Sequence, residues 1–150
     1  MLHRAYAGLL AQGLRYVATH QDVTTTRSRI ACGECYVAEL EASVVATVTF
    51  REASVTAGCE WYDRTDVASF GQLAVAPEYQ QRGIGNALLD SVEERARATG
   101  AAEISLDTSE RAKVLIDWYI RRGYRVVQTA DWEATNYVSV ILSKPVAGRA

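Results

Sequence analysis

The spacing of apolar residues predicts two helices and then two strands in the first third of the chain. Apolar residues recur at helical intervals from Leu2 to Leu10, and Asp22 can cap a second short helix over residues 23–31. Strands are expected over residues 35–40 and 44–50. The polar residues 51–69 that follow form the longest irregular segment, and segments of this kind often carry function.

The second half of the chain predicts a strand, two helices separated by a strand, and two final strands. An apolar strand over residues 70–76 stops at Pro77, and a polar loop then leads to Gly83 and Gly85, which open an amphipathic helix that ends at Gly100. This order predicts an α/β or α+β fold, with a mixed sheet and helices on its faces. The remaining elements are a strand over 103–106, a helix over 110–122, and strands over 124–128 and 137–142.

Composition indicates a single globular domain over residues 1–150. Apolar residues make up 49% and charged residues 23% of the chain, which argues against disordered and fibrous classes. The net charge of −2 argues against nucleic-acid binding by bulk electrostatics, and no apolar run approaches the ~18 residues of a membrane-spanning helix. With three cysteines and no signal peptide, we expect a cytoplasmic protein without nucleic-acid or membrane partners.

The segment between the strand at 70–76 and the following helix has the composition of an anion site. Glycines allow the backbone to approach a phosphate, and the first turn of a helix offers unpaired N–H groups and the positive end of its dipole. A Walker loop would need a lysine that is absent here, and Leu88 stands where a dinucleotide fingerprint has its third small residue. The segment comprises Gln80, Gln81, Arg82, Gly83, Ile84, Gly85 and Asn86.

Two motifs together resemble the GNAT superfamily of acetyl-CoA-dependent N-acetyltransferases. The first is Leu-Ala-Val-Ala-Pro over residues 73–77, followed by Gln80-x-x-Gly83-x-Gly85 and a helix rich in alanine and leucine. The second is Trp-Tyr-Ile-Arg-Arg-Gly-Tyr over residues 118–124, which is similar to the family's helix ending in tyrosine, three residues, glycine and an aromatic residue. The resemblance covers residues 34–143 and implies a mostly antiparallel, mixed GNAT-like sheet flanked by helices.

The resemblance also implies a role for each matching position. Acetyl-CoA would be the acetyl donor, no metal would be needed, and the amine of a small molecule or protein would attack the thioester directly. Tyr119 would protonate the departing thiolate. The cofactor would be held by the strand backbone at Leu73, Ala74 and Val75 and by the loop residues Gln80, Gln81, Arg82, Gly83, Ile84, Gly85 and Asn86.

The base that accepts the proton of the amine is not identified by the resemblance. Many family members carry a glutamate early in the motif strand, whereas residues 69–72 of this chain contain no carboxylate. We choose Asp66 as the base. Asp63, Glu60 and a water relay through Ser69 or Gln72 stay open as alternatives.

Four further possibilities follow from the sequence. A chain without the strand carboxylate could be a non-catalytic acyl-CoA-binding or sensor module on the same fold. Cys32 and Cys35 have the spacing of a redox or metal pair, although too few further ligands accompany them for a structural zinc site. Family members usually begin with a strand, so we expect the sheet to lack that strand or to receive it from a neighbouring chain. A homodimer also stays open.

Overall fold

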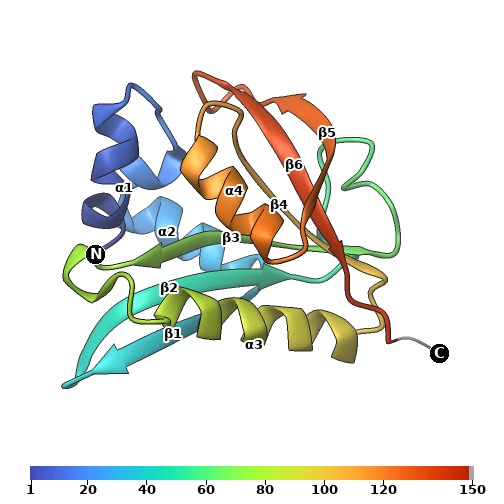
Figure 1. Ribbon diagram of the computed structural model, residues 1–150, viewed down its shortest axis with the longest axis horizontal. Coiled ribbons are helices and arrows are strands. Elements are labelled where there is room, and N and C mark those ends of the chain that lie inside the picture. The colour runs from blue at the N-terminus through green and yellow to red at the C-terminus, as the bar shows by residue number, and fades with distance from the viewer. Residues whose placement is uncertain (149–150) are drawn as a thin grey trace.

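A computed structural model describes residues 1–148 and contains one six-stranded sheet in the order β1-β2-β3-β4-β6-β5 (Figure 1). The predicted α+β fold with a mixed sheet is confirmed. The strands are β1 (Glu34–Leu40), β2 (Ser43–Arg51), β3 (Val67–Val75), β4 (Glu103–Ser109), β5 (Arg125–Asp131) and β6 (Val138–Pro145). The helices are α1 (Leu2–Ala11), α2 (Val23–Ala31), α3 (Ile84–Ala98) and α4 (Lys113–Arg121), with short 3-10 turns η1 (Val17–Thr19) and η2 (Pro77–Tyr79).

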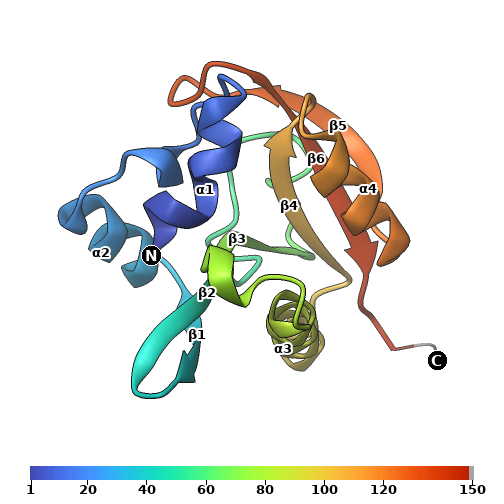
Figure 2. The same cartoon turned by 60° about the vertical axis from the view of Figure 1, so that its left-hand side comes forward.

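The sheet consists of two antiparallel halves, β1-β2-β3 and β4-β6-β5, joined by a short parallel contact. β3 and β4 pair only from Val67–Glu103 to Ser69–Ser105. Beyond these three pairs the strands diverge, as Figure 2 shows. The divergence leaves the C-terminal half of β3 without a partner on one side, and this half carries the first motif.

Helices cover both faces of the first half-sheet (Figure 2). α3 packs against β1, β2 and β3, while α1 contacts β3 and α2 contacts β1 from the other side. Both faces of β2 are therefore buried from Val45 to Phe50, including its threonines. The main core lies between the sheet, α3 and α4, and includes Leu89 and Val92 of α3, which have no exposed surface.

The predicted ends of α2, β1 and β2 are correct to within one residue, whereas β4, β5 and β6 each run three residues past their predicted ends and α4 begins three residues later than predicted. The side chain of Asp22 accepts a hydrogen bond of 2.7 Å from the backbone N–H of Thr25 and caps α2 as predicted. β3 begins at Val67, earlier than the predicted start at residue 70, because its first three residues pair with β4. β1 and β5 form the two outer edges of the sheet.

Candidate active site

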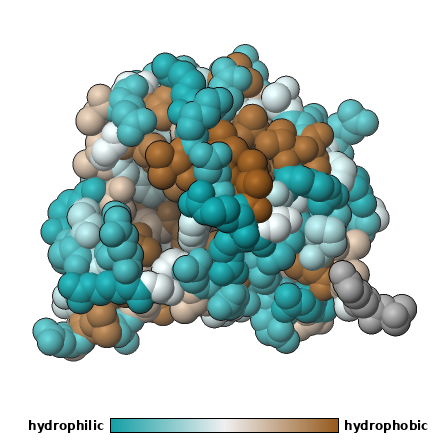
Figure 3. All heavy atoms as spheres, viewed as in Figure 1, coloured by the Kyte–Doolittle hydropathy of each residue, from teal (hydrophilic) through white to brown (hydrophobic). Residues whose placement is uncertain are grey.

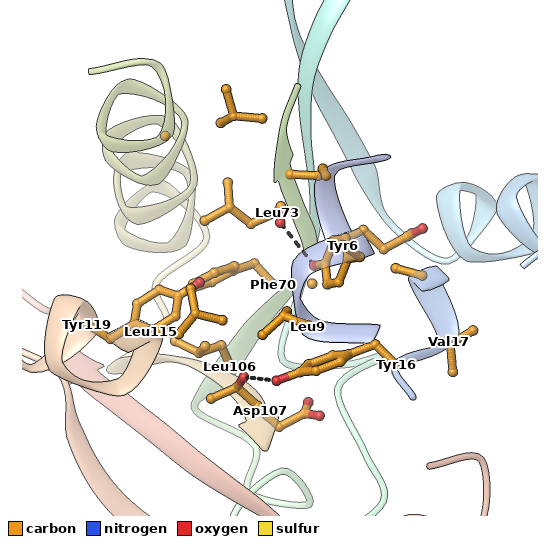
Figure 4. A pocket seen from close by; sticks show the side chains of 18 of the residues that line it. Tyr6, Leu9, Tyr16, Val17, Phe70, Leu73, Leu106, Asp107, Leu115 and Tyr119 are labelled. Carbon is orange, nitrogen blue, oxygen red and sulfur yellow. Dashed lines mark hydrogen bonds between the residues drawn. The ribbon is translucent and has the colours of Figure 1, made fainter. Parts of the chain in front are cut away.

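A cavity of about 730 Å³ lies where β3 and β4 diverge. Residues 70–75 of β3 and 106–108 of β4 form two of its walls, and α1, α4 and the loop before α3 contribute further walls, together with residues from α2, β2 and the segment 132–137. Figure 4 shows α1 side chains on one side of this space and Tyr119 and Leu115 of α4 on the other. Figure 3 shows apolar side chains gathered on the same face of the molecule over α4, where Val114 is 82% exposed.

A β-bulge distorts β3 where it borders the cavity. The register with β2 shifts between Thr47 and Thr49, and Gln72 has a φ of 54°. Its buried side chain is fixed on both sides, since its carbonyl oxygen accepts a 2.8 Å hydrogen bond from Gln21 and its amide donates to Thr49 at 3.4 Å. A bulge of this kind bends the strand and leaves part of its backbone unpaired. The backbone around Leu73 is thus available beside the cavity.

Two tyrosines of the N-terminal segment form hydrogen bonds with backbone groups of the diverging strands. The hydroxyl of Tyr6 donates to the carbonyl oxygen of Leu73 at 3.0 Å (Figure 4). The hydroxyl of Tyr16 accepts from the backbone N–H of Ser109 at 3.1 Å and lies 2.7 Å from the hydroxyl of Thr108. These contacts replace hydrogen bonds that β3 and β4 would otherwise make with each other.

The glycine loop forms one end of the cavity. Gln81 and Gly83 have φ values of 61° and 83°, and Gly83 is the N-cap of α3 without any side-chain cap. The N–H groups of the first helical turn therefore lack protein partners by helix geometry and lie beside the cavity. Arg82 does not line the cavity and lies against the ring of Tyr79, 5.2 Å from its centroid. The predicted residues that do line it are Leu73, Ala74, Val75, Gln80, Gln81, Gly83, Ile84, Gly85 and Asn86.

Tyr119 lies in the cavity wall with its ring buried. The ring packs against Trp118, Tyr124 and Phe70, at centroid distances of 4.9, 5.6 and 6.2 Å. Burial raises the pKa of Tyr119 well above its ordinary value of 10.0, so the phenol is protonated at neutral pH. The structure thus brings the second motif to the same cavity as the first.

Asp107 of β4 is the carboxylate that the cavity contains. The hydroxyl of Tyr62 and the indole N–H of Trp132 donate to its two oxygens at 3.0 and 3.1 Å. The side chain of Asp107 is exposed to the open cavity, although protein atoms lie on all other sides of it (Figure 4). Burial raises the pKa of Asp107 above the ordinary 3.8. The hydrogen bonds from Tyr62 and Trp132 oppose that rise, and so do the positive charges of Arg51 and Arg29.

Comparison with known proteins identifies the family to which this fold and cavity belong. The profile of the Acetyltransferase (GNAT) family matches residues 9–131. The chain belongs to the GNAT acetyltransferase family. An S-(2-succino)cysteine N-acetyltransferase of Bacillus subtilis (strain 168) is 32% identical over 126 residues, which are 81% of this chain and 72% of that protein. The resemblance found from the two motifs is confirmed, and the protein is a GNAT-family N-acetyltransferase.

Solved structures agree with this fold. PH1933 from Pyrococcus horikoshii OT3 superposes with a TM-score of 0.72 at 17% identity, covering 96% of this chain and 87% of that one. A GNAT family acetyltransferase from Elizabethkingia anophelis with acetyl-CoA bound gives a TM-score of 0.63 at 15% identity, with 83% of each chain covered. At such identities the two structures support the GNAT fold alone.

The structure does not bring Asp66 to the cavity of this acetyltransferase. Asp66 precedes β3 at the end where β3 pairs with β4, and Arg64 donates to both of its oxygens, at 3.0 and 2.8 Å. These hydrogen bonds lower the pKa of Asp66, which makes its carboxylate a weaker base. Asp66 is therefore not positioned to accept a proton in the cavity.

The other candidate bases are engaged elsewhere or bound by neighbours. Asp63 accepts from the backbone N–H of Gly58 at 3.0 Å, and Ser69 lies 2.9 Å from Thr56 outside the cavity. Glu60 does not line the cavity, and the amide of Gln72 is held as described above. No sequence signal singles out Asp107, because β4 also contains Glu103, Ser105, Thr108 and Ser109.

Cysteines and metal ligands show no second site in the described part of the chain. Cys32, Cys35 and Cys59 are free thiols, and the sulfur of Cys35 lies 3.3 Å from the hydroxyl of Thr47. Among residues 1–148, no group of three or more histidine, cysteine or acidic side chains could hold a metal ion. Over the same residues, no helix has the length and apolar character needed to cross a bilayer.

Proposed function

We propose that this GNAT protein transfers the acetyl group of acetyl-CoA to the primary amine of an acceptor by direct attack on the thioester. The observation that carries the proposal is the convergence of the two motifs on one cavity. The glycine loop lines one part of it and Tyr119 lines another, although they are far apart in the sequence. An anion site beside a buried phenol is what a phosphorylated thioester donor requires.

The chain offers the groups that acetyl-CoA needs. The N–H groups of residues 81–86 and the dipole of α3 suit its pyrophosphate, with Arg82 adding positive charge at the rim. The backbone of β3 from Leu73 to Val75 suits the pantetheine arm as an added strand. The carbonyl oxygen of Leu73 accepts one hydrogen bond from Tyr6 and retains a second lone pair.

The cavity also supplies proton transfers for the reaction. An alkyl amine is mostly protonated at neutral pH. Asp107 takes the proton of the ammonium form, so that the nitrogen lone pair can attack the thioester carbonyl. A backbone N–H of the bulged β3 stabilises the developing oxyanion. The carbon–sulfur bond then breaks, the sulfur leaves with the electron pair, and the phenol of Tyr119 donates a hydrogen bond and a proton to it.

A thermal-shift assay tests donor binding. Acetyl-CoA at ~100 times its dissociation constant should stabilise the protein by about 2.7 kcal/mol. The absence of any shift with saturating acetyl-CoA or CoA would overturn the donor assignment. A shift without thiol release for any amine would indicate a non-catalytic acyl-CoA-binding module instead.

Tyr119→Phe tests the role of the phenol, because it keeps the buried ring and removes only the hydroxyl. The expected loss in kcat is about 10²-fold or more. Equal turnover in single-turnover experiments, where chemistry limits the rate, would remove Tyr119 from the mechanism.

The acceptor is best sought by a thiol-release screen over amine classes. The Bacillus subtilis relative is named for S-(2-succino)cysteine, so this amine belongs in the screen together with other amino acids, small amines and peptides with free N-termini or lysines.

A further inference from the structure

Two arginines line the cavity without an anionic partner. Arg29 comes from α2, and Arg51 is the last residue of β2. None of the ion pairs within 4.0 Å among residues 1–148 includes either of them. The cavity therefore contains two guanidinium groups and the carboxylate of Asp107, with no contact that neutralises the positive charges.

Gln21 holds the guanidinium group of Arg29, and Gly71 leaves space for that of Arg51. Arg29 donates to the side-chain oxygen of Gln21 at 2.6 Å. Arg51 lies across β3, with its Nη1 atom 3.4 Å from the position that a Cβ atom on Gly71 would occupy. The absence of a side chain at Gly71 thus leaves room for the Arg51 guanidinium beside the cavity.

The positive charge of Arg29 is unfavourable for the protein alone. Burial lowers the pKa of Arg29, and the charge of Arg51 lowers it further. Asp107 interacts with both arginines electrostatically, but its oxygens accept hydrogen bonds from Tyr62 and Trp132. Charges held in a protein interior without a partner are costly, and a bound anion removes that cost.

The anion that these arginines suit is not the pyrophosphate of the donor. Gly71, beside Arg51, and Val75, beside the glycine loop, are four residues apart on one strand, which is about 13 Å along its axis. Arg29 donates to Gln21, which donates to Gln72, and Asp107 is two residues beyond the last β3–β4 pair at Ser105. The arginines and Asp107 thus lie away from the glycine loop, at the acceptor end of the cavity.

We infer that Arg29 and Arg51 bind a carboxylate of the acceptor, so that the preferred acceptors are amines that also carry a carboxylate, such as α-amino acids. The inference rests on the proposed acetyl transfer and adds the substrate class. The ammonium group of the acceptor pairs with Asp107, and its carboxylate pairs with the guanidinium groups, which match carboxylate geometry by two parallel hydrogen bonds. One acceptor then satisfies charges of both signs.

Matched substrates test the inference. Thiol release is measured with acetyl-CoA and a series of L-amino acids, each compared with its primary amide at a pH where both amines are deprotonated, so that the negative charge is the main difference. We expect kcat/KM to be at least tenfold higher for the acids. Equal values for acids and amides, or a preference for the amides, would overturn the inference while leaving acetyl transfer intact.

Variants show whether the arginines cause this preference. Arg51→Gln and Arg29→Gln should each raise the KM of the acids at least tenfold and leave that of the amides and of acetyl-CoA nearly unchanged. Arg51→Lys keeps the charge and should retain part of the preference. Arg27→Gln is the control, because Arg27 lies on the same helix, is exposed and does not line the cavity. Equal losses for acids and amides would assign the arginines a structural role only.

A binding measurement keeps the two proposals separate. With CoA present, an amino acid should raise the melting temperature of the wild type more than its amide does, and Arg51→Gln should abolish that difference. If CoA raises the melting temperature but no amine releases thiol, the proposed acetyl transfer fails. The difference in melting temperature between acid and amide still tests the carboxylate site in that case. A wild-type shift equal for acid and amide would overturn the carboxylate site.

Discussion

Gly83 offers a test of how backbone conformation holds the donor loop. Its φ of 83° is accessible to glycine and unfavourable for L-residues, while a Cβ atom built there meets nothing within 4 Å. Any cost of Gly83→Ala is therefore conformational and not steric. Gly8 is the matched control, since a Cβ atom there also meets nothing within 4 Å but the residue lies inside α1 with no positive φ.

The two substitutions should have opposite effects on stability. A non-glycine residue in the left-handed region costs about 1–2 kcal/mol, whereas replacing a helical glycine by alanine gains about 0.5–1 kcal/mol. For 150 residues the entropy of unfolding is about 0.3 kcal/mol per kelvin, so 1 kcal/mol corresponds to ~3 °C. Gly83→Ala should lower the melting temperature by about 3–6 °C, and Gly8→Ala should raise it by about 2–3 °C.

The assay combines melting curves with acetyl-CoA titrations. If the loop keeps its shape, the conformational cost of Gly83→Ala lowers the free energy of unfolding. If the loop relaxes to negative φ, its N–H groups turn away from the cavity and acetyl-CoA binds more weakly. Gly83→Ala with an unchanged melting temperature and an unchanged dissociation constant would refute the reasoning, as would a loss of stability in Gly8→Ala of the same size.

Two further predictions concern the base and the core. Asp107→Asn should lower kcat/KM by about 10²–10⁴-fold. Because burial raises the pKa of Asp107 above 3.8, wild-type activity should fall as the pH drops through that raised value, and the variant should lose this limb. An identical acid limb in both proteins would exclude Asp107 as the base. Leu89→Ala, at a side chain with no exposed surface, should cost about 2–5 kcal/mol in urea unfolding. The exposed control Val114→Ala should change stability by less than about 0.5 kcal/mol, and equal costs would contradict the described core.

Local chemistry accounts for what the sequence predicted well. Asp22 caps its helix through its own side chain, and Gly83, Gly100 and Gly123 end or begin helices with the positive φ that glycine permits. The donor loop is likewise continuous in the chain, so its residues reach the cavity together. Such features depend on neighbours in sequence and can be recognised without the fold.

The acceptor side depends on contacts between distant segments, and the sequence misplaced it. Asp66 lies near the motif strand in sequence, but the three-residue pairing of β3 and β4 puts it at the opposite end of that strand from the donor loop. Asp107, Arg29 and Arg51 meet only because β4, α2 and β2 converge there. The spacing of these residues along the chain does not predict that convergence.

The divergence of β3 and β4 also affects how the protein avoids aggregation. An unpaired strand edge can recruit a strand from another molecule, and this sheet has two inner edges in addition to its outer ones. The N-terminal segment lies over the inner edges, and Tyr6 and Tyr16 engage one backbone group on each. The same segment that walls the substrate cavity is therefore a shield against intermolecular β-pairing, and changes that loosen α1 carry a solubility cost in addition to a catalytic one.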